Sequence, residues 1–203
     1  MGVLDVYNVE NVDKVYLDSI KTSLELFKIN NPEQMCVSCI QYLKSSKSTL
    51  KADLDNHTFT SLYDEAQNER VREALKHIIT RVLHTFFENN DHNGDFIFES
   101  WINMICYQQE YIYNNEFHDH YSINVMDDRF IPDKSIVFYI QIPNCLLNYD
   151  GVLFYKIKDE VKYILPKECE MIVMNSKISH LPNNAPHTTL DRIALGINIK
   201  LLK

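Results

Sequence analysis

The sequence predicts an α+β protein in which N-terminal helices support a β-rich C-terminal half. In the first part of the chain, apolar residues recur at the spacing of amphipathic helices. From about residue 96 onward, short runs of β-branched and aromatic residues alternate with turn signals, which is typical of sandwiches and barrels. We expect a single compact unit with a helical extension over residues 1–95, packed on a β core over residues 96–203.

Two segments of the extension carry clear amphipathic stripes. The first helix is predicted from Val12 to about Asn30. A longer helix carries an apolar stripe from Val71 to Phe87, with charged residues on its opposite side. Because the first helix and the sheet are the only evident apolar partners for this stripe, we expect the long helix to back the β sheet.

A further helix is predicted between these two. The segment Asn31–Gln34 supplies an N-cap, a proline at the first helical position and a glutamine at N3, so we expect a helix through about Leu43. The polar segment Ser45–His57 is expected to be a loop. Cys36 and Cys39 invite a redox or zinc interpretation, but buried helix positions are favoured, because zinc needs two more ligands nearby.

The β core begins after a turn. Residues Asn89–Asp95 imitate a calcium loop, but Ser100 stands at the twelfth position, where an EF-hand has a bidentate glutamate. We therefore expect a turn between the long helix and the first strand. Later strands are predicted at Ser135–Ile142, Val152–Ile157, Val161–Leu165, Met171–Met174 and Leu190–Leu201.

Three histidines in this half predict a metal site. In an extended strand successive side chains alternate, so His118 and His120 share one face while Asp119 points away. Strand pairing must bring His180 to them. Three imidazoles with open positions then give the facial geometry of a non-haem iron site. We expect His187 to be an exposed loop residue outside this set.

These histidines belong to a longer series of segments: Ser100–Asn103, His118–His120, Ser135–Pro143, Gly151–Phe154, Pro166, Met171–Asn175, His180–Pro182 and Arg192–Asn198. The series resembles the 2-oxoglutarate/Fe(II) oxygenase superfamily. The prolyl-hydroxylase-like branch with H-x-H in place of H-x-D, common in phages and marine bacteria, is the one it resembles most. The resemblance implies a double-stranded β-helix, a jelly roll whose mouth holds iron.

The resemblance also implies roles for individual residues. His118 and His180 match the iron histidines, and His120 stands where the family usually has aspartate. The implied cofactors are Fe(II), held by these three catalytic ligands, and 2-oxoglutarate.

Arg192 matches the basic residue that binds the far carboxylate of 2-oxoglutarate, and Tyr139 matches a second cosubstrate ligand. Asn103 is either a further cosubstrate contact or a buried residue that ties down a strand edge. The residues after Arg192 are apolar, which indicates that it is buried and needs a carboxylate partner. That partner is the cosubstrate or an acidic residue of the chain; Asp191 is a poor choice, because adjacent strand residues face opposite ways.

Composition limits the classes of partner and the cellular location that we expect. The chain has 28 acidic against 20 basic residues and a formal net charge of −8, so we do not expect nucleic acid as a direct ligand. The start of the chain lacks a signal-like pattern and no apolar run is long enough to span a bilayer, so we expect a soluble cytoplasmic protein. Five cysteines, an odd number, fit reduced thiols. Only 4 glycines, with abundant Asn, Ile, Lys and Tyr, indicate an AT-rich genome such as that of a phage or virus.

Three functions are compatible with these features. The leading one is an Fe(II)- and 2-oxoglutarate-dependent dioxygenase that hydroxylates a small-molecule or peptide substrate. The second is a three-histidine, cupin-like dioxygenase or isomerase that does not use 2-oxoglutarate. The third is a non-catalytic jelly roll that serves as a structural or assembly protein of a virus or phage. The sequence sets neither the substrate nor the oligomeric state.

Overall fold

The computed structural model describes residues 4–30, 36–57, 59, 65–105, 117–124, 130–143, 151–183 and 190–203. Its helices are α1 (Lys14–Asn30), α2 (Leu50–Asn56), α3 (Glu65–Glu88) and α4 (His120–Asn124). Its strands are β1 (Leu4–Asn8), β2 (Cys36–Ser45), β3 (Phe96–Ile105), β4 (Lys134–Gln141), β5 (Leu153–Ile157), β6 (Glu160–Ile164), β7 (Glu170–Asn175), β8 (His180–Pro182) and β9 (Arg192–Leu201).

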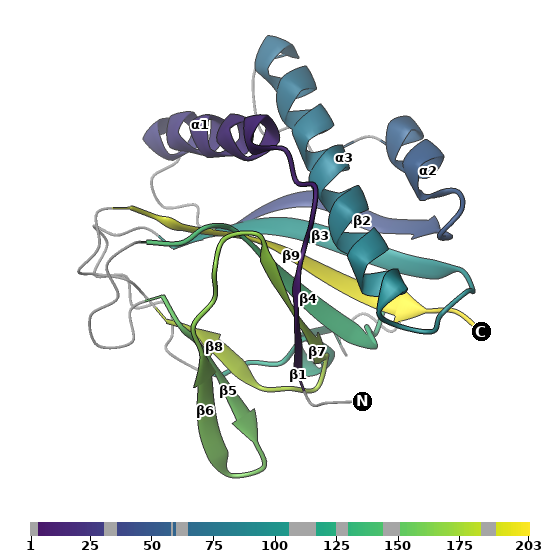
Figure 1. Cartoon of the computed structure of the whole chain (residues 1–203), viewed down its shortest axis with the longest axis vertical. Coiled ribbons are helices and arrows are strands. Elements are labelled where there is room, and N and C mark those ends of the chain that lie inside the picture. The colour runs from purple at the N-terminus through teal and green to yellow at the C-terminus, as the bar shows by residue number, and fades with distance from the viewer. Residues whose placement is uncertain are drawn as a thin grey trace.

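The described strands form two antiparallel sheets. The large sheet has six strands in the order β1-β7-β4-β9-β3-β2, and the small sheet has three in the order β6-β5-β8. The long strand β9 lies near the middle of the large sheet and pairs with both β3 and β4. Helices α1, α2 and α3 lie on one side of the large sheet, and the small sheet lies on the other (Figure 1).

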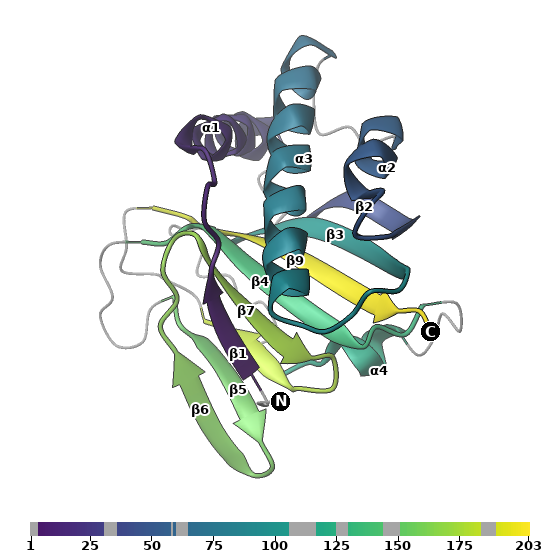
Figure 2. The same cartoon turned by 45° about the vertical axis from the view of Figure 1, so that its right-hand side comes forward.

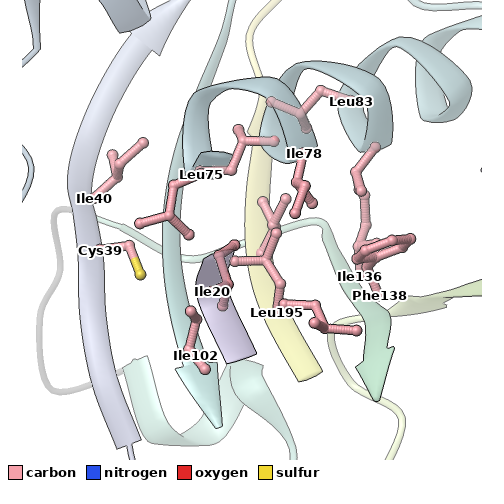
Figure 3. Close-up of a cluster of buried hydrophobic side chains, with 14 of the residues drawn as sticks. Ile20, Cys39, Ile40, Leu75, Ile78, Leu83, Ile102, Ile136, Phe138 and Leu195 are labelled. Carbon is pink, nitrogen blue, oxygen red and sulfur yellow. The ribbon is translucent and has the colours of Figure 1, made fainter. Parts of the chain in front are cut away.

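The helix-covered face holds the main core. Helices α1 and α3 lie where the sequence predicts amphipathic helices, and α3 crosses the sheet with its apolar stripe buried (Figure 2). Each such Leu, Ile or Phe side chain contributes about 1.5–3 kcal/mol relative to an exposed one. Side chains from α1, α3 and the large sheet meet in this core (Figure 3): Ile20, Leu75, Ile78, Leu83, Ile102, Ile136, Phe138 and Leu195.

The opposite face of the large sheet carries different residues. Along β9, the side chains of Ile193, Leu195, Ile197 and Ile199 belong to the core under the helices. Because strand residues alternate, the residues between them face the small sheet. A second, smaller core forms there from Tyr139, Ile142, Leu153, Ile172, Met174 and Ala194.

The prediction of a helix over residues 36–43 is wrong. This segment is strand β2, which pairs with β3 and buries Val37, Cys39 and Ile40. The register shifts near Tyr42, which has a positive φ of 53°, as in a β-bulge. Pairing with β3 outweighs the local helix-capping signal. The capping residues themselves lie outside the described part of the chain.

The expected loop at Ser45–His57 is also wrong, because it contains the helix α2. Leu50 and Leu54, one helical turn apart, are 0% and 1% exposed, so two leucines in a polar segment suffice to dock the helix. Asp53 accepts hydrogen bonds from the hydroxyls of Ser45 (2.8 Å) and Thr49 (2.6 Å), which ties α2 to the end of β2.

The first 95 residues supply strands as well as helices. Strand β1 pairs with β7 at one edge of the large sheet, and β2 forms the other edge. The predicted strands of the C-terminal half correspond to β4, β5, β6, β7 and β9, and residues 89–95 form an irregular connection with bends before β3. Cys36, Cys39 and Cys169 form no disulfide bond, whereas Cys106 and Cys145 lie outside the described residues. None of the described helices is long and apolar enough to cross a membrane.

Candidate metal centre

Three histidines converge between the sheets. His118 and His180 form an antiparallel bridge in which each backbone N–H donates to the other residue's carbonyl, at 3.0 and 2.8 Å. Directly opposed residues of such a pair project their side chains to the same side. His120 completes the group, and the three ligand nitrogens lie within 4.8 Å of one another.

The spacing fits a shared metal ion. The Nε2 atoms of His120 and His180 lie 3.2 Å apart. Two imidazole nitrogens that each lie about 2.0–2.1 Å from one ion stand roughly 3 Å apart. The rings of His118 and His180 are 4.5 Å apart between centroids, and those of His118 and His120 are 5.7 Å apart. The residues present therefore fit a metal held by three imidazoles.

Local structure around Asp119 separates it from the ligand set. His118 lies in the bridge and His120 is the first residue of α4, so the strand geometry expected for this triplet holds only at its first residue. Asp119 accepts hydrogen bonds from the backbone N–H (2.6 Å) and hydroxyl (2.9 Å) of Ser122. The carboxylate thus acts as the N-terminal cap of α4 and is not one of the three grouped ligands.

Burial keeps two of the rings neutral. Desolvation, aided by the charges that His180 and His118 would carry, lowers the pKa of His120 to about 3. Desolvation also lowers the pKa of His180 to about 4, although its hydrogen bond to the Ile178 carbonyl acts in the opposite direction. A neutral imidazole is the form that binds a metal. Both rings are therefore ready to act as ligands at neutral pH.

Neighbouring groups hold the rings in place. Nδ1 of His180 lies 3.0 Å from the carbonyl of Ile178, so Nδ1–H donates and Nε2, which faces His120, keeps its lone pair. The indole of Trp101 stacks on His120 with ring centroids 5.4 Å apart. This indole also lies against Gly196, where an added Cβ would come within 2.4 Å of it. A residue without a side chain is required at position 196.

Arg192 and Tyr139 meet deep between the sheets. They are 2% and 0% exposed, and Nη2 of Arg192 donates to the Tyr139 hydroxyl at 3.2 Å. Burial raises the pKa of Tyr139, while the adjacent guanidinium acts in the opposite direction. The charge of Arg192 also contributes to the lowered pKa of His180, so the guanidinium lies close enough to influence the histidine cluster.

Arg192 lacks an acidic partner among the described residues. Its Nε is buried without a hydrogen-bond partner there. Asp191 is committed elsewhere, because it forms an ion pair with Lys28 at 2.9 Å. A buried guanidinium with an unsatisfied donor is costly unless an anion binds it. The donor set therefore fits a carboxylate ligand.

Asn103 lies beside this group. It pairs in register with Ala194, two residues from Arg192 on the same face of the sheet. Its Oδ1 atom is buried and has no hydrogen-bond partner among the described residues. His187 lies outside the described part of the chain.

No family model and no curated protein matches the chain. Among solved structures, HygX from Streptomyces hygroscopicus with nickel and 2-oxoglutarate bound aligns with a TM-score of 0.56 and 9% identity, over 98% of this chain and 82% of that chain. A prolyl hydroxylase from Trichoplax adhaerens, in complex with a hypoxia inducible factor peptide fragment, aligns with a TM-score of 0.55 and 14% identity, over 97% of this chain and 83% of that chain. IDO from Bacillus thuringiensis aligns with a TM-score of 0.56 and 11% identity, over 99% of this chain and 91% of that chain.

The chain has the fold of 2-oxoglutarate-dependent oxygenases. At these identities the likeness extends to the fold alone. Its two facing antiparallel sheets are consistent with the double-stranded β-helix expected from the sequence.

The sequence-based prediction of the site missed several residues near the histidines. Asn198, Glu99 and Ser135 form a hydrogen-bonded group on the site face of the large sheet. The available signal was polar residues at alternate positions within the strongly apolar strand β9. That alternation shows that Asn198 shares a face with Arg192, but it does not show which neighbouring strands it meets.

Proposed function

We propose that the protein is a non-haem Fe(II)- and 2-oxoglutarate-dependent dioxygenase that hydroxylates a small-molecule or peptide substrate. One observation carries this proposal: three imidazoles converge within ligand distance beside a buried arginine whose Nε has no partner among the described residues. The fold shared with 2-oxoglutarate-dependent enzymes supports it.

In this proposal His118, His120 and His180 hold the iron. The set is neutral, because histidine stands where a carboxylate is usual in the superfamily it resembles. Three protein ligands leave open positions for cosubstrate. When bound, the iron and 2-oxoglutarate supply the oxidative chemistry, and the protein binds and orients them.

Arg192 and Tyr139 bind the distal carboxylate of 2-oxoglutarate. A guanidinium stays charged at any working pH and binds a carboxylate with two parallel hydrogen bonds. The Tyr139 hydroxyl accepts a hydrogen bond from Nη2 of Arg192, which fixes the orientation of the guanidinium. Asn103 pairs in register with Ala194, two residues from Arg192, and makes a third contact by donating from its amide nitrogen.

The test is metal and cosubstrate binding by protein purified without oxygen. We expect one Fe(II) per chain, binding of 2-oxoglutarate to the iron-loaded protein in calorimetry, and succinate formation when oxygen is admitted. Iron binding without 2-oxoglutarate binding would favour the cupin-like function. Absence of metal binding would favour a structural jelly roll.

A further inference from the structure

We propose that Lys28 is a positioning residue for Arg192: through Asp191 it fixes the start of β9 and so aims the buried guanidinium at the anion site. The inference rests on the proposed function, since it concerns how the arginine that binds 2-oxoglutarate is presented. It gives a task in cosubstrate binding to helix α1, which lies on the other side of the large sheet from the small sheet and the metal centre (Figure 1).

Arg192 stands at the end of the paired part of β9. It pairs with Ile105, the last residue of β3, and the register with β4 ends at the pair of Gln141 with Ile193. The pairing with β4 is also irregular there, because the register shifts between Tyr139 and Gln141. The last residues of an element have the fewest backbone partners and open most readily. The direction of the guanidinium therefore depends on what holds the residue before it.

That residue, Asp191, is held by two distant elements. Nζ of Lys28, in the last turn of α1, lies 3.0 and 2.9 Å from the two carboxylate oxygens. Nε2 of Gln141 on β4 donates to the backbone carbonyl of Asp191 at 2.8 Å. Both the side chain and the main chain of the residue before Arg192 are thus fixed.

The ion pair also sets the rotation of the strand. Neighbouring strand residues face opposite ways, so Asp191 reaches α1 while Arg192 points between the sheets. A rotation that took the carboxylate away from Lys28 would also turn the guanidinium away from the Tyr139 hydroxyl, to which it donates at 3.2 Å. The backbone of Lys28 is itself anchored, because the preceding side chain, Phe27, is buried in the main core.

Burial distinguishes this pair from an ordinary surface ion pair, which contributes little to stability. The side chains of Lys28 and Asp191 are 27% and 17% exposed, and the ammonium meets both carboxylate oxygens. Another lysine of α1 provides a comparison. Nζ of Lys21 lies 3.7 Å from one oxygen of Glu168, whose side chain is 46% exposed. Lys21 thus ties the same helix to the segment before β7 and not to β9.

The first experiment observes the guanidinium directly in metal-free protein. The Nε–H signal of Arg192 is recorded in ¹⁵N-arginine-labelled protein and assigned with Arg192→Lys. Because this Nε is buried, its proton should exchange slowly with water in the wild type. Lys28→Met, which keeps the length of the side chain and removes its charge, should shift the signal and speed its exchange. Lys28→Arg, which can still bind both oxygens, should behave as the wild type.

The second experiment compares two affinities by calorimetry. Lys28→Met should weaken 2-oxoglutarate binding to the cobalt(II)-loaded protein about 2- to 30-fold. The cobalt affinity of this variant should equal that of the wild type, because the three grouped histidines hold the metal. Asp191→Asn should have the same effect as Lys28→Met. The double variant should bind 2-oxoglutarate no more weakly than either single variant, since one ion pair links the two residues.

Lys21→Met is the matched control, and its Arg192 signal and 2-oxoglutarate affinity should equal those of the wild type. An unchanged Arg192 signal in Lys28→Met, or an equal change in Lys21→Met, would overturn the inference. A parallel loss of cobalt affinity in Lys28→Met would also overturn it, because it would indicate a general loss of structure. If Lys28→Met changes the signal while wild-type protein fails to bind 2-oxoglutarate, the positioning role stands and the proposed function falls.

Discussion

Arg192 and Tyr139 are buried together between the two sheets, with the arginine Nη2 donating to the tyrosine hydroxyl at 3.2 Å. The guanidinium lies 5.0 Å from the centre of the tyrosine ring, so one aromatic side chain both stacks on it and accepts from it. The pair leaves Nε of Arg192 without a partner among the described residues. This geometry presents a fixed cation to an anionic ligand.

Replacing Arg192 should weaken 2-oxoglutarate binding and spare the metal. Hydrogen bonds to charged groups contribute about 1.5–3 kcal/mol, so Arg192→Lys should raise the Kd about 10- to 100-fold. Lysine keeps the charge but loses the fork. Calorimetry on metal-loaded protein measures this change. Equal binding by Arg192→Ala and wild type would exclude the carboxylate role.

Metal binding should change the fluorescence of Trp101. It is the only tryptophan of the chain, and it stacks on His120. We expect cobalt(II) to quench its emission in the wild type and to lose this effect in His118→Ala or His180→Ala. His77→Ala is the control, because His77 stacks on Tyr16 outside the cluster. Quenching that survives in both ligand variants would count against the three-histidine site.

The metal-free protein should lose stability as the pH falls from about 6.5 toward 4. His120 and His180 have folded-state pKa values of about 3 and about 4, below the unfolded value near 6.5. In this window the unfolded chain binds protons that the folded chain does not, so the free energy of unfolding decreases by up to about 1.4 kcal/mol per pH unit for each histidine. Above pH 6.5 both states are neutral at these positions and the effect is absent.

Denaturant titrations at several pH values measure this dependence. His120→Gln removes one titrating ring and should flatten the slope between pH 4 and 6.5. An identical slope in the variant would show that burial does not hold this ring neutral.

Gly196→Ala should disturb the metal centre through Trp101. The added Cβ would stand 2.4 Å from Cε2 of the indole, so the ring must move away from its stacked position on His120. Overpacking of this kind costs about 1–3 kcal/mol. Denaturant unfolding should show the loss of stability, and the tryptophan emission maximum should shift. An unshifted emission maximum in the variant would contradict this account.

Cleavage between β2 and α2 should leave the fragments associated. Ser46 to Thr49 form an exposed turn, whereas β1 and β2 are the two edge strands of the large sheet and α3 packs across it. Limited proteolysis followed by size-exclusion chromatography should therefore give one peak that contains both fragments. A folded, metal-binding fragment starting near residue 90 would show that the first part of the chain is dispensable.

The sequence alone determined those elements whose signal is local. Apolar spacing placed α1 and α3, and runs of β-branched residues placed β4 to β7 and β9. It also selected the three histidines that the structure brings together. Side-chain periodicity and residue chemistry are properties of short segments, so they can be read without a partner strand.

Only the tertiary structure decided what depends on pairing between distant segments. A helix-capping signal precedes residues 36–45. These residues nevertheless form strand β2, because β3 offers hydrogen bonds and an apolar face. Asn198 meets Glu99 and Ser135 because β9 lies between β3 and β4. Spacing along the chain shows which face a side chain takes, but the strand order determines which groups meet there.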